Sequence, residues 1–301
     1  MPNNTGHVRS SGLQANNSAI HQQVVQEVLK ALENQRGAMQ LAGRKFESKF
    51  GGKQGGDSVV VNVVGTPVIK DYTRGQSIVY DPTNSGTVKL YLTQSKYSAV
   101  QLDDLDDVEL SVNLLAEYQM RMAEGFADTM NRFIVSDICA SAIAVGHNVN
   151  MALDENNIIK GLIDFKQTFS SRLALKAGET LRIALPLEAQ SLLEAHMYNK
   201  QTPQMVDDNK LSTPVSGYAP TIKLFESLEV TFDSTLTQNA NGLYQCPAAV
   251  TGGYEFFAAM EPKTEKIRLQ STFADATRAL AHYGGGVVYD AKLGCISATF
   301  S

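Results

Sequence analysis

The sequence has 301 residues, of which 43% are hydrophobic and 19% charged, a globular composition with enough apolar material for a sizeable core. Its net charge of −5 and pI of about 5.6 disfavour a conventional DNA-binding module, which would be basic. No run of about 18 or more apolar residues predicts a membrane span. The first residues lack the basic start and apolar stretch of a signal peptide, so we expect a protein that stays in the cytoplasm.

Residues 1–50 are expected to form an N-terminal arm with six basic and three acidic residues. Residues 1–18 are rich in Asn, Ser, Gly and Thr and cannot bury themselves, so they are predicted to be mobile. An amphipathic helix is predicted from about Ile20 to Leu41, because an apolar stripe recurs at helical spacing. The stripe consists of Val24, Val25, Val28, Leu29 and Leu32. So narrow a stripe needs a partner surface to stabilise the helix.

Residues 51–100 are predicted to form a long β-hairpin with a small sheet. The glycines of Gly51–Gly56 indicate a hinge, and the residues that follow are rich in Val, Ile and Tyr. The predicted strand segments are 58–64, 66–70, 77–80 and 87–93. In the last of these, Val88, Leu90 and Leu92 recur at every second position, which is the period of a half-buried strand. An isolated hairpin is at best marginal in water, so this one should lie against something else.

Residues 101–150 combine an acidic run with a long helical pattern, and they hold nine acidic and two basic residues. The acidic run consists of Asp103, Asp104, Asp106 and Asp107. These carboxylates suit the positive end of a helix dipole, so we expect the helix to begin there, capped by either Asp107 or Ser111. Apolar residues keep three-to-four spacing to about Ala144 without a proline, which predicts a helix of ~35 residues and ~50 Å.

From Gly146 onward the pattern alternates between helices and strands, which predicts a mixed α/β region. Helices are predicted over 156–175 and, after Pro186, over 187–198. Strands are predicted at 181–185, 228–232, 243–250, 255–260, 266–271, 286–290 and 293–300. Residues 199–220 contain three prolines and are expected to be a long loop.

No constellation of catalytic or metal-binding residues is recognisable, so neither an enzyme nor a cofactor is predicted. The five histidines are scattered, and GxSxG, Walker A and GxGxxG patterns are absent. Gly284–Gly286 precedes a strand and lacks the helix N-terminus that binds phosphate, so it is interpreted as a turn between a helix and a strand. The four aspartates lack the glycine and the later glutamate of an EF-hand loop, and are interpreted as a solvated helix start or as an interface with a basic partner.

The cysteines Cys139, Cys246 and Cys295 are far apart in the sequence and odd in number. This spacing fits neither a disulfide framework nor a metal site with paired cysteines. They are therefore interpreted as free thiols in a reducing compartment.

Five stretches of the sequence, taken in their order along the chain, resemble a known protein family. They are GDSVVVNVVGTPVIKDYTRGQSIVY (56–80), TVKLYLTQSKYSAVQLDDLD (87–106), LLAEYQMRMAEGFADTMNRFI (114–134), ETLRIALPLEAQSLLEA (179–195) and STFADATRALAHYGGGVVYD (271–290). In this order they resemble the major capsid proteins of tailed bacteriophages, which have the HK97-type fold.

The resemblance implies an α+β fold with five parts. These are an N-terminal arm with an amphipathic helix (1–50), an extended β-hairpin called the E-loop (51–100), a P domain with a long spine helix (101–150), a mixed α/β A domain (151–270), and a C-terminal segment that returns to the sheet of the P and A domains (271–301).

The function that the resemblance implies is structural: a subunit that assembles, as hexamers and pentamers, into an icosahedral shell around double-stranded DNA. Assembly would take place in the bacterial cytoplasm, around a portal. Because the chain reaches the hairpin by residue 51, a separate scaffolding protein and no processing of this chain are expected. The N-terminal arm is expected at the inner surface, against a neighbour, the scaffold or the packaged DNA. Some family members crosslink a hairpin lysine to a neighbour; Lys53, Lys70 and Lys89 lie in that region, and a shell without crosslinks is expected.

In the family, the E-loop of one subunit lies over the spine-helix region of the next. We therefore expect some of the basic hairpin residues to face the acidic run of a neighbouring subunit. The residues concerned are Lys70, Arg74 and Lys89 on one side and Asp103, Asp104, Asp106 and Asp107 on the other. The alternative is that both groups are simply solvated.

Two other functions remain open at this point. One is an encapsulin-like shell of a bacterial compartment, which would hold enzyme cargo in place of DNA. The other is a cytoplasmic α/β enzyme of unknown activity, for which gel filtration would give a small soluble monomer.

Overall fold

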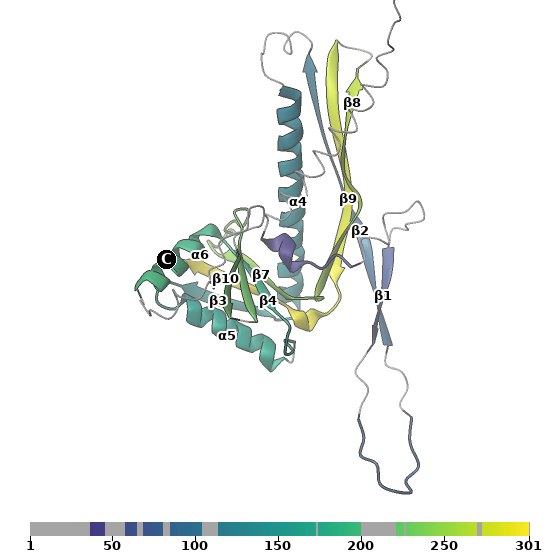
Figure 1. Ribbon diagram of the computed structural model, residues 1–301, viewed down its shortest axis with the longest axis vertical. Coiled ribbons are helices and arrows are strands. Elements are labelled where there is room, and N and C mark those ends of the chain that lie inside the picture. The colour runs from purple at the N-terminus through teal and green to yellow at the C-terminus, as the bar shows by residue number, and fades with distance from the viewer. Residues whose placement is uncertain are drawn as a thin grey trace, which may run out of the picture.

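One long helix, α4 (Leu114–Ala144), runs along the elongated computed structural model of the protein (Figure 1). The structure describes residues 37–45, 58–64, 69–80, 85–103, 114–172, 174–199, 221–225, 227–269 and 273–300. Most of the predicted N-terminal arm, the hinge at Gly51–Gly56 and the loop after Asn199 therefore lie outside the described residues.

The 31 residues of α4 confirm the predicted long helix up to Ala144, whereas its predicted cap, Asp107 or Ser111, lies outside the described residues. Asp103 is the last residue of a strand, and residues 104–113 lie outside the described part of the chain. One side of α4 is buried at every fourth position, through Met122, Phe126, Met130, Ile134 and Ile138. This stripe packs the helix against strands of both sheets.

A four-stranded antiparallel sheet lies along α4, in the order β1-β2-β9-β8. Its strands are β1 (Ser58–Val64), β2 (Ser85–Asp103), β8 (Tyr254–Arg268) and β9 (Ala274–Val287). The residues of β9 that face the helix are buried and mostly small, namely Thr277, Ala279, Ala281 and Tyr283. The Tyr283 ring packs edge-on against Phe133 of α4, with ring centroids 5.6 Å apart.

A mixed six-stranded sheet lies at one end of α4 (Figure 1), in the order β3-β10-β7-β4-β6-β5. Its strands are β3 (Asn148–Leu153), β4 (Leu181–Leu185), β5 (Thr221–Phe225), β6 (Leu228–Phe232), β7 (Tyr244–Val250) and β10 (Leu293–Phe300). The strand predictions at 181–185, 228–232 and 293–300 are confirmed with these bounds, and the prediction at 243–250 is confirmed to within a residue by β7.

Helices cover both faces of the six-stranded sheet. One face carries α5 (Ile158–Ser171) and α6 (Leu187–Asn199), the two helices predicted in this region. A Cβ at Gly294 would come within 2.7 Å of Phe169 and 2.9 Å of Phe165, so the glycine lets α5 lie directly on β10. The next residue, Cys295, faces the other side of the sheet, where its thiol is hydrogen-bonded to Cys139 of α4.

Two strand predictions around the hairpin and its neighbour were wrong. Residues 69–80 contain no strand, although parts of them were predicted as strands at 66–70 and 77–80. The segments 255–260 and 266–271 were predicted as separate strands, whereas β8 runs continuously from Tyr254 to Arg268. Strands β3 and β5 were not predicted at all.

The interpretation of Gly284–Gly286 as a turn between a helix and a strand was also wrong, because these glycines lie inside β9. A Cβ at Gly284 would collide with the backbone carbonyl of Tyr91 in β2, and a Cβ at Gly285 would collide with the Tyr254 hydroxyl of β8. The glycines are therefore needed where the neighbouring strands approach β9 closely.

The buried apolar residues form two clusters. The larger one includes residues of α4, α5, α6 and both sheets, and the smaller one centres on Leu90 of β2 and Phe257 of β8. Among the helices that the structure describes, none is both long and apolar enough to cross a membrane.

Candidate interaction surface

The hairpin of β1 and β2 projects away from the rest of the molecule, with residues 69–80 at its far end (Figure 1). The two strands pair from Ser58↔Tyr91 to Val64↔Ser85. At the root, partly buried side chains of both strands pack around Leu90 and Phe257, namely Val59, Val61, Val88 and Leu92. This small cluster confirms the predicted alternation on β2 and attaches the hairpin to β8.

Residues 69–80, which we call the tip, expose large apolar side chains to solvent. The exposed fraction is 96% for Ile69 and 87% for Tyr80, and between these two it is 66% for Tyr72, 65% for Ile78 and 72% for Val79. A contiguous exposed apolar surface of this kind typically marks a site of interaction with another protein or a membrane. The Ile, Val and Tyr residues that led to the strand predictions at 66–70 and 77–80 are also the residues that make the tip apolar.

A tight turn shapes the tip at residues 73–76. The Gln76 amide donates a hydrogen bond to the Thr73 carbonyl at 2.9 Å, and Gly75 has a φ of +90°. That backbone conformation suits glycine, because it has no Cβ. The turn places Arg74 at the centre of the tip, where its side chain is exposed.

The predicted charged residues lie far apart within one chain. Lys70 and Arg74 are on the tip, Lys89 is exposed on β2, and Asp103 ends the same strand. At about 3.3 Å per residue, the stretch of β2 from Lys89 to Asp103 is about 45 Å long. Any pairing of these groups would therefore have to join two subunits. The other three aspartates, Asp104, Asp106 and Asp107, lie outside the described residues.

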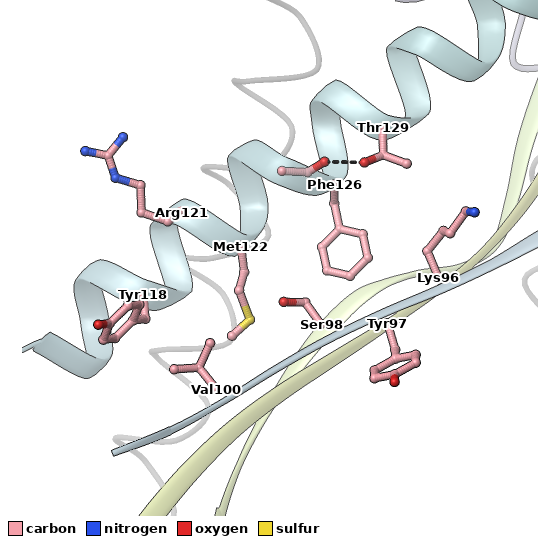
Figure 2. Close-up of a pocket in the computed structure, with 10 residues that line it drawn as sticks. Lys96, Tyr97, Ser98, Val100, Tyr118, Arg121, Met122, Phe126 and Thr129 are labelled. Atoms are coloured by element: carbon pink, nitrogen blue, oxygen red, sulfur yellow. Dashed lines mark hydrogen bonds between the residues drawn. The ribbon is translucent and has the colours of Figure 1, made fainter. Parts of the chain in front are cut away.

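Figure 2 shows a groove of about 430 Å³ between α4 and β2 that the sequence did not predict. It is lined by Lys96, Tyr97, Ser98, Val100, Tyr118, Arg121, Met122, Gly125, Phe126 and Thr129. Met122 and Phe126 point from the helix toward the strand and are buried, whereas Tyr97 and Tyr118 are exposed. The lining contains no carboxylate, histidine or cysteine, and it combines an apolar floor with the basic side chains of Lys96 and Arg121.

Exposed ion pairs run along the paired strands β8 and β9. Asp275 lies 2.7 Å from Lys266 and 3.2 Å from Arg268, and Glu265 accepts from Arg278 at 3.0 Å. The hydrogen bond from Lys266 lowers the pKa of Asp275, burial opposes this lowering, and the hydrogen bond from Arg268 adds to it. Pairs this exposed contribute about 0–1 kcal/mol each, so they keep the strands soluble more than they stabilise them.

The cysteines are free, as interpreted from the sequence, and all three are buried in the structure. Burial raises the pKa of Cys246 well above its usual range, and the hydrogen bond with Cys295 together with burial does the same for Cys139. These thiols stay protonated at neutral pH and are poor nucleophiles. No group of three or more potential metal ligands occurs within the described ranges of the chain.

No protein-family model and no curated protein sequence matches this chain. Its structure does match solved structures from bacteriophages. A chain from Mycobacterium phage Che8 is 19% identical, with a TM-score of 0.61 over 86% of this chain and 90% of that one. A chain from the mature capsid of bacteriophage PhiM1 is 13% identical, with a TM-score of 0.58 over 82% of this chain and 83% of that one.

A third match comes from the capsid of cyanophage P-SCSP1u, at 11% identity and a TM-score of 0.58 over 82% of this chain and 84% of that one. These likenesses extend over most of both chains. The mixed α/β fold of this protein is therefore the fold found in phage capsid structures.

Proposed function

We propose that this protein is the major capsid protein of a tailed bacteriophage, a shell subunit and not an enzyme. The observation that carries the proposal is the match to phage capsid structures over most of the chain. The exposed apolar tip supports it independently, because a protein that worked alone would gain nothing from that surface. Fold alone does not define function, but a shell subunit functions by assembling.

The HK97-type architecture assigns a role to each part of the structure. The hairpin of β1 and β2 with its tip would be the E-loop, and α4 would be the spine helix of the P domain. Strands β8 and β9 extend the hairpin sheet along α4, which suits a rigid P domain. The six-stranded sheet with α5 and α6 would form the A domain.

The tip would lie across a neighbouring subunit and bury its apolar side chains there. Obligate interfaces bury roughly 2,000–5,000 Å². At about 25 cal/mol per Å² of apolar area, this burial outweighs surface ion pairs. Pairing of Lys70, Arg74 or Lys89 with a neighbour's acidic run would then set the register of the contact and its rate of formation.

The partners in this proposal are other copies of the chain as hexamers and pentamers, a separate scaffolding protein, a portal and packaged double-stranded DNA. The DNA contact would come from the mildly basic arm, which lies mostly outside the described residues. Three net positive charges would release few counterions, so this contact would be weak and sensitive to salt.

Electron microscopy of the purified protein, expressed alone and with the scaffolding protein of its phage, tests the proposal. Closed shells are the expected result. A protein that remains a small monomer at high concentration under both conditions would refute the proposal and favour an enzyme. Shells that contain an enzyme, and that contain no DNA even after infection, would favour the encapsulin-like alternative. The likeness to phage capsids does not favour that alternative.

A further inference from the structure

The hairpin strand β1 is an open edge of the four-stranded sheet. The strand order β1-β2-β9-β8 leaves β1 paired only with β2, from Ser58↔Tyr91 to Val64↔Ser85. In an antiparallel pair, every second residue points its N–H and C=O groups away from the partner strand. Within the described part of the chain, no strand pairing or isolated bridge lies on that side of β1. The described residues therefore leave these backbone groups available to an added strand.

The opposite edge of the same sheet, β8, has features that hinder strand addition, and β1 has none of them. Strand β8 contains Pro262 and the charged residues Lys266 and Arg268, and its register against β9 shifts twice. Proline, charge and bulges are common means by which proteins protect an edge strand. Strand β1 has the sequence SVVVNVV, with five valines and neither proline nor charge. An unprotected edge of this composition is suited to pairing with another strand.

The second half of the tip, residues 77–80, has the composition of a strand but pairs with no strand in the described chain. Ile78, Val79 and Tyr80 are strand-forming residues, and all three are exposed. Among the described residues of the tip, the one backbone–backbone hydrogen bond runs from Gln76 to Thr73. The sequence predicted a strand at 77–80, and the structure describes none there. Both observations are met if the strand forms on contact with another chain.

The open edge and residues 77–80 do not meet within one chain. Strands β1 and β2 pair as far as Val64↔Ser85, and the tip lies beyond that end of the hairpin (Figure 1). Residues 77–80 precede β2, which lies on the opposite side of β1 from the open edge. A second copy brings the two elements together without altering the hairpin of either chain.

We propose that residues 77–80 of one copy add as a strand to the open edge of β1 in a second copy. In this arrangement backbone hydrogen bonds hold the segment, and its side chains alternate between the two faces of the extended sheet. Ile78 and Tyr80 lie on one face, and Val79 lies on the other. The inference rests on the proposed contact between subunits and specifies its form, which is backbone pairing and not charge pairing.

Disulfide crosslinking between variants with one introduced cysteine tests this arrangement. Val60→Cys places a thiol on the open strand, at a residue that is 49% exposed. Ser77→Cys, Ile78→Cys, Val79→Cys and Tyr80→Cys each place one along the segment. Every tip variant is assembled together with Val60→Cys and oxidised with diamide, and bonds between unlike chains are located by mass spectrometry. The native cysteines are buried, so the introduced thiols react first.

Strand addition predicts a crosslinking pattern with a period of two residues. Opposed residues of neighbouring strands have Cβ atoms about 4.5–5.5 Å apart, which is close enough for a disulfide after a small adjustment. We expect yields about fivefold or more higher at every second tip position, because alternate side chains of a strand point to opposite faces. Tyr97→Cys is the control, since Tyr97 is 81% exposed on β2 beyond the residues that pair with β1. It should crosslink weakly with every tip variant.

Hydrogen exchange of the wild type gives a second measurement, which does not depend on assembly of the variants. Exchange of residues 58–64 and 77–80 should slow together on assembly, by about tenfold or more. The inference is overturned if particles form while crosslinking to Val60→Cys shows no alternation or is no stronger than at Tyr97→Cys. Slower exchange in β1 without slower exchange at 77–80 also overturns it, because another strand would then cover the edge. Particles that form with either result leave the proposed function standing, whereas a wild type that never assembles overturns both.

Discussion

The six-stranded sheet and the hairpin tip use the same kinds of residue in opposite ways. In β4, all residues except Arg182 are buried, and the sheet around it is covered by α4, α5 and α6. In the tip, five of the twelve residues are Ile, Val or Tyr, and their side chains lie in solvent. The sheet therefore buries its apolar residues within one chain, whereas the other described residues leave the tip uncovered, and we propose a neighbouring subunit as its partner.

The largest expected effect comes from making the tip polar. Replacing Tyr72, Ile78 and Tyr80 together by Ser should abolish particle formation, because the apolar contact with a neighbour is lost. The free energy of unfolding of the monomer should change by no more than about 0.5 kcal/mol, since these side chains are exposed.

The control for this variant replaces two exposed apolar residues of the body, Ile163→Ser on α5 and Leu187→Ser on α6. These changes should leave assembly intact. Particle yield by sedimentation and stability by urea denaturation give the two readouts. Normal particles from the tip variant would contradict the distinction between an apolar tip that contacts a neighbour and a sheet that is complete within one chain.

The next largest effect concerns the body of the molecule, where a substitution in the core should lower the free energy of unfolding. Phe169→Ala removes a fully buried ring that packs on Gly294 and on Phe165, with ring centroids 5.3 Å apart for the two phenylalanines. Such truncations cost about 3–5 kcal/mol. Phe273→Ala, at an 82% exposed residue between β8 and β9, should change stability by about 0.5 kcal/mol or less. Equal losses in the two variants by urea denaturation would contradict the assigned core.

A smaller effect depends on pH and distinguishes a half-buried carboxyl whose pKa is raised from a half-buried carboxyl whose pKa is lowered. Burial raises the pKa of Asp137 on α4, and the nearby Tyr254 hydroxyl opposes this only in part. The stability that this group contributes is therefore present below the ordinary pKa of an aspartate and is lost as pH rises through the raised value. Asp137→Asn should gain stability relative to the wild type as pH increases from acidic to neutral.

Asp275→Asn is the comparison, and its slope has the opposite sign. Its pKa is lowered, first by Lys266, so its contribution is present above the ordinary aspartate pKa and is lost as pH falls. The pair is exposed, so the difference should stay within about 1 kcal/mol. Thermal unfolding across a pH series measures both slopes, and slopes of the same sign would contradict the assignment.

The smallest effect concerns charge at the proposed contact between subunits. Reversing Asp103 and Asp104 to Lys should slow assembly most at low salt, with each exposed pair contributing only about 0–1 kcal/mol. Adding Arg74→Glu should partly restore the rate. Light scattering across a salt series gives the rate, and a reversal with no effect at any salt concentration would eliminate the pairing.

The spacing of apolar residues was enough to predict those helices and strands whose conformation is not altered by the elements packed against them. The apolar stripe of α4 and the buried strands β4 and β10 follow directly from residue spacing. Of β9, only residues 286–287 lay in a predicted strand, and that prediction (286–290) wrongly continued past Val287. The rest was missed because its alanines favour a helix locally while the contact with α4 requires small side chains on a strand. Tertiary packing decides the conformation there.

The interaction surface was predictable in position but not in form. Residue types that favour strands pointed to 66–70 and 77–80, yet the structure describes no strand between 69 and 80. The groove between α4 and β2 depends on which residues of two distant segments meet, such as Met122 and Val100, and no signal within either segment records that. The charged residues could be named from the sequence, and whether they pair depends on a second subunit.

A cryo-electron microscopy reconstruction of the assembled protein tests the central claim most directly, because it locates the tip relative to neighbouring chains. We expect Tyr72, Ile78 and Tyr80 to be buried against another copy of the chain. A tip that remains in solvent, or that folds back onto its own subunit in the assembled particle, would contradict the account.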